Sequence, residues 1–228
     1  MTIAATSTTP SSTTLIAGSG GQINITAPQI STQTGALLQA NGNNGPGGNF
    51  NLQATQLAIA GSVQANGNTG GVIASQSESS NIASGALIQA NGNNGPGGAI
   101  ALQTSNDQII NNATVQANGT GNGGNIKIAS SSGGLNLQSA LIQTNGANGR
   151  GGSIETQANS GSILTSSAIQ TIGATQGGKI TLERRIQRAA VQQDILAHDK
   201  PRLLAAQKGA GGAEFGSGAI AAEIGRAS

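Results

Sequence analysis

The sequence predicts an all-β fold, a parallel β-helix of about seven stacked coils of about 26 residues each. Pairs of glycines recur at nearly constant spacing, and between them apolar residues alternate with polar ones, as in strands rather than helices. The composition agrees, because glycine makes up 37 of 228 residues and only two residues are aromatic. Such a chain can build only a narrow core of aliphatic side chains.

The glycine pairs define the repeat. Successive pairs lie 23 to 28 residues apart, which is the length of one turn of a solenoid. Residues 36–54 and 86–104 are its best-matched copies. The first glycines of the pairs are Gly20, Gly47, Gly70, Gly97, Gly123, Gly151 and Gly177.

Residues 1–14 form a Ser/Thr-rich N-terminal segment, and the β-helix is expected over residues 15–182. Leu15 and Ile16 resemble a strand of an earlier, incomplete coil. In each full coil a strand follows the glycine pair, and a large apolar residue stands two positions after the second glycine. We expect these residues to point inward: Ile23, Phe50, Ile73, Ile100, Ile126, Ile154 and Ile180.

A second strand precedes the next loop and is centred on a glutamine. The residues on either side of that glutamine are apolar or small, so we expect them inside the coil and the glutamine outside. The resulting outward ladder consists of Gln39, Gln64, Gln89, Gln116, Gln143 and Gln170. A third, less regular strand is expected midway, for example at residues 57–59 and 135–137.

An asparagine followed by glycine ends the second strand. Asn and Gly tolerate positive φ, and stacked Asn amides can bond to backbone groups, so these positions predict a structural turn ladder. Asn-Gly is also typical of a β-hairpin, but the whole unit repeats with one polarity, which favours the solenoid. The ladder comprises Asn41, Asn66, Asn91, Asn118 and Asn145.

The pattern stops at Glu183. Residues 183–228 are expected to form a helix and then a flexible stretch, since residues 183–198 lack glycine and place Ile186, Ala190 and Ile195 at helical spacing. This C-terminal tail could cap the last coil. An unrelated linker, or a sequence that departs from the natural continuation of the repeat, is the alternative.

Composition also excludes several classes of function. The net charge of +2 comes from the tail, and stacking aromatics are lacking, so nucleic-acid binding is not expected. No cysteine is present, aspartates do not recur at calcium-roll spacing, and no cofactor or metal site is expected. The sequence contains no transmembrane segment and no recognisable signal peptide. For an exported protein we therefore expect the leader to lie outside this sequence.

The strand motif GGxIxIxA and the corner (A/S/T)(L/V/I)QANG resemble the β-helical repeat region of filamentous haemagglutinin family exoproteins, the adhesins exported by two-partner secretion. The resemblance covers about residues 15–182. It implies a right-handed β-helix, an extracellular or cell-surface bacterial location, and adhesion or biofilm contacts through a fibre. The sequence departs from the family in lacking the Asn-Pro motifs of its N-terminal secretion domain.

Enzymatic chemistry is not expected. The carboxylates of the repeat region, Glu78, Asp107 and Glu155, fall in different coils and in different phases of the repeat, so they predict no glycosidase pair. His198 is the sole histidine and has no recognisable nucleophile to serve. No catalytic residue is therefore assigned.

The function expected is a structural or adhesive β-solenoid that forms part of a surface fibre. End-to-end self-association and contact with surface glycans, host surfaces or abiotic surfaces are its expected interactions. The glutamine ladder has two interpretations: amides that stiffen the stack, or a polar face that binds glycans. A carbohydrate-binding or polysaccharide-processing β-helix is the alternative function, and ice binding is a more distant one because threonines are scattered.

Overall fold

The computed structural model describes residues 2–4, 14–16 and 20–184, and these form a parallel β-solenoid of about six turns. The chain divides into the units Met1–Ile186 and Gln187–Ser228, and all described residues belong to the first. The described residues contain strands and turns but no helix. The strands are β1 (Thr2–Ala4), β2 (Thr14–Ile16), β3 (Gln22–Thr32), β4 (Leu37–Gln39), β5 (Asn49–Ile59), β6 (Ser62–Gln64), β7 (Val72–Ile82), β8 (Leu87–Gln89), β9 (Ala99–Thr104), β10 (Gln108–Asn111), β11 (Thr114–Gln116), β12 (Asn125–Ser130), β13 (Leu135–Gln138), β14 (Leu141–Gln143), β15 (Ser153–Ala158), β16 (Ile163–Thr165), β17 (Ala168–Gln170) and β18 (Lys179–Arg184).

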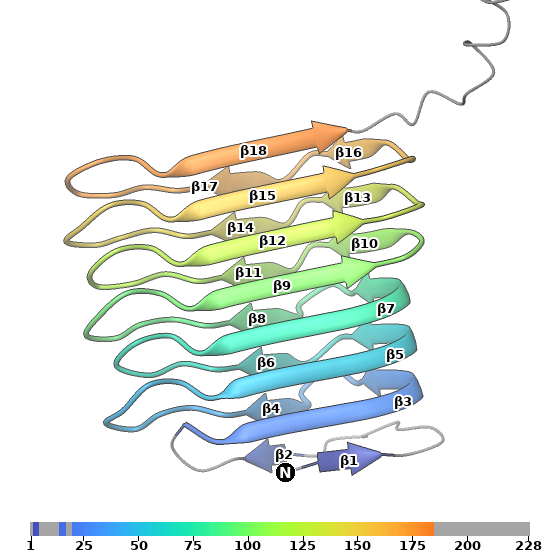
Figure 1. Cartoon of the computed structure of the whole chain (residues 1–228), viewed down its shortest axis with the longest axis horizontal. Helices are drawn as coiled ribbons and strands as arrows, with labels where there is room; N and C mark the ends of the chain where they lie inside the picture. The colour runs from blue at the N-terminus through green and yellow to red at the C-terminus, as the bar shows by residue number, and fades with distance from the viewer. Residues whose placement is uncertain (1, 5–13, 17–19, 185–228) are drawn as a thin grey trace, which may run out of the picture. The chain divides into compact units, whose positions relative to one another are not determined.

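Each strand pairs in parallel with its counterpart in the next coil. One sheet, called here the long sheet, runs β1-β3-β5-β7-β9-β12-β15-β18 and also includes β10, β13 and β16. The other, the short sheet, runs β2-β4-β6-β8-β11-β14-β17. In Figure 1 the strands β3, β5, β7, β9, β12, β15 and β18 run left to right in front, and β10, β13 and β16 lie behind them at the right. The chain returns through the short sheet behind, and successive coils rise. This path is a right-handed helix, as expected.

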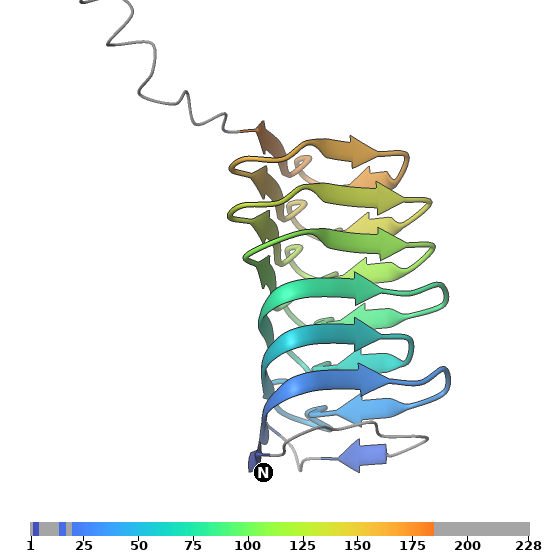
Figure 2. The same cartoon turned by 90° about the vertical axis from the view of Figure 1, so that its right-hand side faces the viewer.

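The coils change form midway through the stack. β3, β5 and β7 are single strands of 11 residues, whereas later coils divide the same path into β9 and β10, β12 and β13, and β15 and β16. The separating corners are residues 105–107, 131–134 and 159–162, which are mostly Ser, Asn and Gly. Figure 2 shows the first three coils bending continuously and the later ones turning through loops. The predicted third strand is therefore present, but in the first three coils it continues the first strand.

The core consists of stacked rows of aliphatic side chains. Ile23, Phe50, Ile73, Ile100, Ile126 and Ile154 are each at most 1% exposed, which confirms their predicted inward direction. Ala40, Ala65, Ala90 and Ala117 beside the Asn-Gly corner are fully buried. Burying each Ile or Leu contributes about 1.5–3 kcal/mol, and each coil supplies several. Stability therefore depends on neighbouring coils.

The glycine pairs lie where consecutive coils approach most closely. A Cβ atom added to Gly98 would overlap the carbonyl oxygen of Gly71 in the preceding coil, and one added to Gly71 would overlap that of Gly48. Backbone stacked this closely leaves no space for a side chain. Steric exclusion between coils therefore explains why the pair recurs in every coil.

The Asn-Gly corner differs from its prediction in one respect. Among the described residues, positive φ occurs at Asn112, Ser139 and three glycines, but not at the Asn-Gly pairs. The glycine of the corner is needed for space instead, because a Cβ on Gly92 would overlap the carbonyl oxygen of Pro96.

The β-helix extends slightly beyond both of its predicted ends, residues 15 and 182. β1 already pairs with β3 at Thr2–Ala4, and β2 pairs with β4 with Leu15 opposite Leu38, which confirms an earlier coil. β18 runs through Glu183 and Arg184, so the predicted helix does not begin at residue 183. The remainder of that predicted helix lies outside the described residues.

Candidate functional site

The predicted glutamine ladder lies along the short sheet. Gln39, Gln64, Gln89, Gln116, Gln143 and Gln170 are half-buried and occupy equivalent positions in successive strands. Their amides bond along the stack: Nε2 of Gln39 donates to Oε1 of Gln64 (2.9 Å), and Gln89 to Gln170 form a continuous chain with bonds of 2.9, 3.0 and 2.7 Å. Much of the hydrogen-bonding capacity of this ladder is therefore used within the protein.

The asparagine ladder runs beside it. The side-chain Oδ1 of each asparagine accepts a bond from the backbone N–H one coil later, at 2.7–2.9 Å, from Asn41 through to Ile172. In three coils Nδ2 also points toward the neighbouring glutamine, for example from Asn118 to Oε1 of Gln143 at 3.4 Å. The two ladders thus form one amide network that joins successive coils.

The structure places a second glutamine row on the long sheet, and sequence reasoning missed it. Gln53, Gln76 and Gln103 are aligned on β5, β7 and β9, with Thr26 of β3 before them. All are exposed, and these three glutamine side chains make no hydrogen bond with any described residue. The signal was available, because each glutamine lies five positions after the second glycine of its pair.

A shallow groove lies beside this row. It has a volume of about 810 Å³ and follows the corner of the first coils. Ala27, Ala54 and Ser77 form one register row along it. A smaller hollow of about 270 Å³ shares Gln76, Ser77 and Ser105 and reaches Asn159. The first groove is lined by Thr26, Ala27, Pro28, Gln53, Ala54, Thr55, Gln76, Ser77, Glu78 and Ser105.

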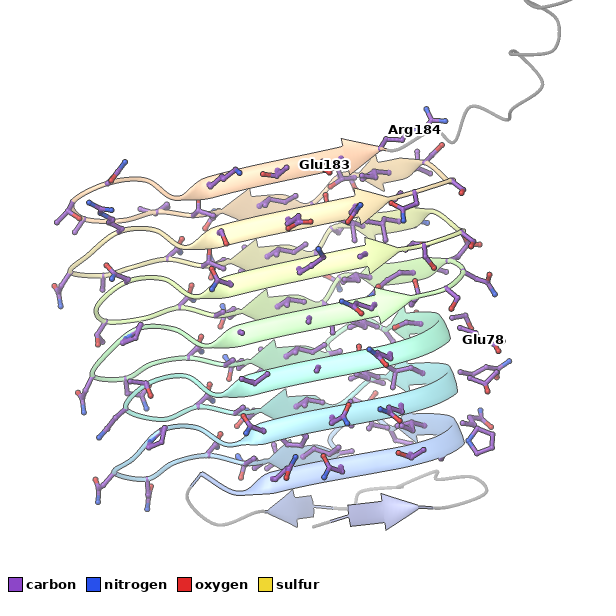
Figure 3. All side chains as sticks on the ribbon, viewed as in Figure 1. Glu78, Glu183 and Arg184 are labelled. Atoms are coloured by element: carbon purple, nitrogen blue, oxygen red, sulfur yellow. The ribbon has the colours of Figure 1, made fainter. Side chains whose placement is uncertain are left out.

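The carboxylates occupy separate environments, although two of them share a corner. Asn106 N donates to the backbone oxygen of Glu78 (2.7 Å), which continues the pairing of Ser77 with Thr104. Asp107 therefore lies near Glu78 on the next coil but, as expected, at a different position of the repeat. The Asp107 side-chain Oδ1 accepts a bond from Gly134 N at 2.8 Å. Glu78 is exposed at the groove, at the edge of the stack labelled in Figure 3.

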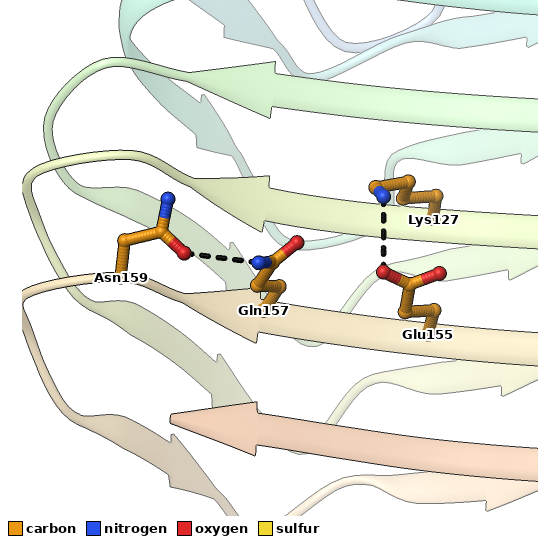
Figure 4. Close-up of polar contacts among 4 residues, drawn as sticks. All are labelled: Lys127, Glu155, Gln157 and Asn159. Carbon is orange, nitrogen blue, oxygen red and sulfur yellow. Dashed lines mark hydrogen bonds and ion pairs between the residues drawn. The ribbon is translucent and has the colours of Figure 1, made fainter. Parts of the chain in front are cut away.

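The third carboxylate forms an ion pair on the long sheet. Lys127 Nζ lies 2.9 Å from Oε1 of Glu155 on the neighbouring strand, as Figure 4 shows. Both side chains are about two-fifths exposed, so the pair contributes at most about 1 kcal/mol. Nearby, Gln157 donates to Oδ1 of Asn159 at 3.0 Å. Glu155 is thus held by a neighbouring coil.

Metal and membrane features are lacking in the described part of the chain. It contains no group of three or more metal-binding side chains and no helix that could span a membrane. His198 lies outside the described residues.

Comparison with protein-family models, curated proteins and solved structures gives no match for this chain. The fold and its repeated rows define the class: a parallel β-solenoid repeat protein, compatible with the β-helical repeat region that the motifs resemble. Any functional assignment therefore depends on the geometry of the two glutamine rows and the groove.

Proposed function

We propose that this chain is an extracellular structural or adhesive β-solenoid, a segment of a surface fibre of the filamentous haemagglutinin type, whose outer face makes the contacts. The observation that supports this most directly is the regular register of the stack. From β3 to β18 the equivalent strands of successive coils pair with each other, and their inward-facing residues are aligned. Two of the outward rows present uncharged amide side chains.

A non-enzymatic role agrees with the positions of the carboxylates. Glycoside hydrolysis needs two carboxyl groups on opposite sides of one bond. Glu155 faces Lys127, and Asp107 accepts a backbone hydrogen bond, so each has a structural partner. The shallow groove favours carbohydrate binding as the second candidate function. An enzyme that processes polysaccharides would be the catalytic version of this second candidate.

The proposal is tested by immobilising the purified chain on beads and measuring attachment to glycan-coated, host-cell and abiotic surfaces under flow. We expect attachment above that of beads carrying an unrelated protein of similar charge. A reducing-sugar assay on neutral and acidic polysaccharides runs in parallel. Release of sugars would support the processing alternative, and lack of attachment to every surface would refute the adhesive proposal.

A further inference from the structure

The two glutamine rows have the same residue type but different bonding. On the short sheet the amides bond to each other and to the asparagine ladder. On the long sheet Gln53, Gln76 and Gln103 are exposed and make no bond with any described residue. Each free amide offers two donors and an acceptor at a fixed register position. The long-sheet row therefore has hydrogen-bonding capacity available for a ligand.

We propose that this row and its groove bind an extended neutral polysaccharide chain lying along the axis of the stack. The inference rests on the proposed adhesive function and names the ligand class and the site. Sugar hydroxyls both donate and accept hydrogen bonds, as amides do, so a line of unpaired amides matches a line of hydroxyl groups.

The spacing of the row favours a polymer over a single sugar. Successive coils lie about 4.8 Å apart. One pyranose unit of an extended β-1,4-linked chain advances by a similar length. Thr26, Gln53, Gln76 and Gln103 would therefore meet successive sugar units, and affinity would increase with chain length.

The chemistry of the groove selects a neutral chain. Its lining contains no basic side chain, and its one charged residue is Glu78. An acidic polysaccharide would find no cation there and would be repelled by that carboxylate. Pro28, which is exposed, and Ala54, which is half-buried, add small apolar surfaces against which the C–H faces of sugar rings can pack.

The test uses the whole chain and calorimetric titration with cellobiose, cellohexaose and a galacturonic acid hexamer. We expect cellohexaose to bind at least tenfold more tightly than cellobiose, and the acidic hexamer to bind weakly. The triple variant Gln53→Ala/Gln76→Ala/Gln103→Ala should lower cellohexaose affinity at least tenfold. Its thermal midpoint should stay near that of the parent, because these amides make no bonds in the fold.

The matched control removes three exposed amides from the loops on the other side of the coil. The variant Asn43→Ala/Asn93→Ala/Asn148→Ala should leave cellohexaose affinity unchanged. Equal affinity in the glutamine variant and the parent, equal loss in the control, or equal binding of the acidic hexamer would overturn the inference. If cellohexaose affinity does not depend on these glutamines while the beads still attach to a surface, the adhesive proposal is retained and only this site is rejected.

Discussion

Asn118 shows how one residue joins three coils. Its backbone N–H donates to Oδ1 of Asn91 (2.9 Å), and its own Oδ1 accepts from the N–H of Asn145 (2.7 Å). The asparagine at this corner is therefore required for its amide oxygen, which satisfies a backbone donor that the turn leaves free.

The substitution Asn118→Ala should lower stability by about 1–3 kcal/mol, because the part-buried N–H of Asn145 loses its acceptor. Urea unfolding followed by circular dichroism measures the shift in midpoint. Asn148→Ala is the control, since that side chain is exposed in the adjacent loop, and its effect should stay within about 0.5 kcal/mol. Equal shifts for both variants would contradict a role for the ladder.

Gln108 is the opposite case, a polar residue in an aliphatic row. It is fully buried, and neither its Nε2 nor its Oε1 has a hydrogen-bond partner. Its register neighbours are Ser80 in the coil before and Leu135 in the coil after. The equivalent residues in the first two coils are Ile30 and Leu57.

Replacing Gln108 with Leu should raise stability by about 1–3 kcal/mol, because an unsatisfied buried amide is exchanged for an apolar group that suits the row. Thermal unfolding measures the effect. Gln138→Leu, at an exposed position on β13, should give no such increase. A fall in midpoint for Gln108→Leu would show that the amide has a stabilising partner in solution.

At the scale of the structural element, the glycine pair sets how closely coils stack. A Cβ on Gly151 would overlap the carbonyl oxygen of Thr171 in the next coil. At the equivalent position of the last described pair, Gly177, the nearest atom among the described residues is the same oxygen at 4.0 Å. The first glycine of the pair therefore has no room for a side chain at Gly151, where another coil is stacked on it, but has room at Gly177 in the last described coil.

Gly151→Ala should lower stability by about 1–3 kcal/mol, because the added methyl group forces two backbones apart. Gly177→Ala should change it by less than about 0.5 kcal/mol. Urea titration of both variants beside the parent measures the difference. If Gly177→Ala proves as destabilising as Gly151→Ala, the glycines act through chain flexibility and not through stacking distance.

The strands and their inward rows were predictable because stacking imposes one rule on every coil. A residue such as Ile100 must align with Ile73 and Ile126, so large apolar residues recur at the same position of every repeat in the sequence. The corners after β9, β12 and β15 follow no such rule, since they face solvent and vary in length. The sequence therefore did not predict that these corners divide the single bent strand of the earlier coils into two strands.

The candidate site was only partly predictable for a related reason. Repetition indicates that a glutamine faces outward, but bonding depends on its neighbours across coils. Gln143 receives Nδ2 of Asn118, whereas Gln76 lies beside the corner residues Ser77 and Glu78 and makes no bond with any described residue. The sequence therefore predicted the short-sheet glutamine row, whose amides are bonded, and only the structure identified the long-sheet row, whose amides are free of bonds with described residues.

At the scale of the whole molecule, the stack of described coils stops at an open face. Within the described residues, β16, β17 and β18 have a strand neighbour on one side only. The inward row that is buried elsewhere is partly exposed here, with Ile180 at 43% and Leu182 at 48%. Unpaired strand edges beside exposed aliphatic side chains are a template for pairing with another chain.

We expect this face to pair with the N-terminal coil of a second copy, which presents the edges of β1 and β2. Such a head-to-tail contact does not close on itself, so it extends into a filament. Sedimentation equilibrium of the whole chain should therefore show an average mass that rises with concentration. The double variant Ile180→Lys/Leu182→Lys should remain monomeric, because two buried ammonium groups would oppose the contact.

The control for that experiment adds the same two charges to the outward face of the long sheet, as Asn49→Lys/Asn125→Lys. Because these positions point away from the stacking axis, the control should associate like the parent. End-to-end stacking would be contradicted if the chain stays monomeric at every concentration both as the parent and after removal of residues 185–228. A control that blocks association as strongly as the inward lysines would attribute the effect to net charge and not to the open face.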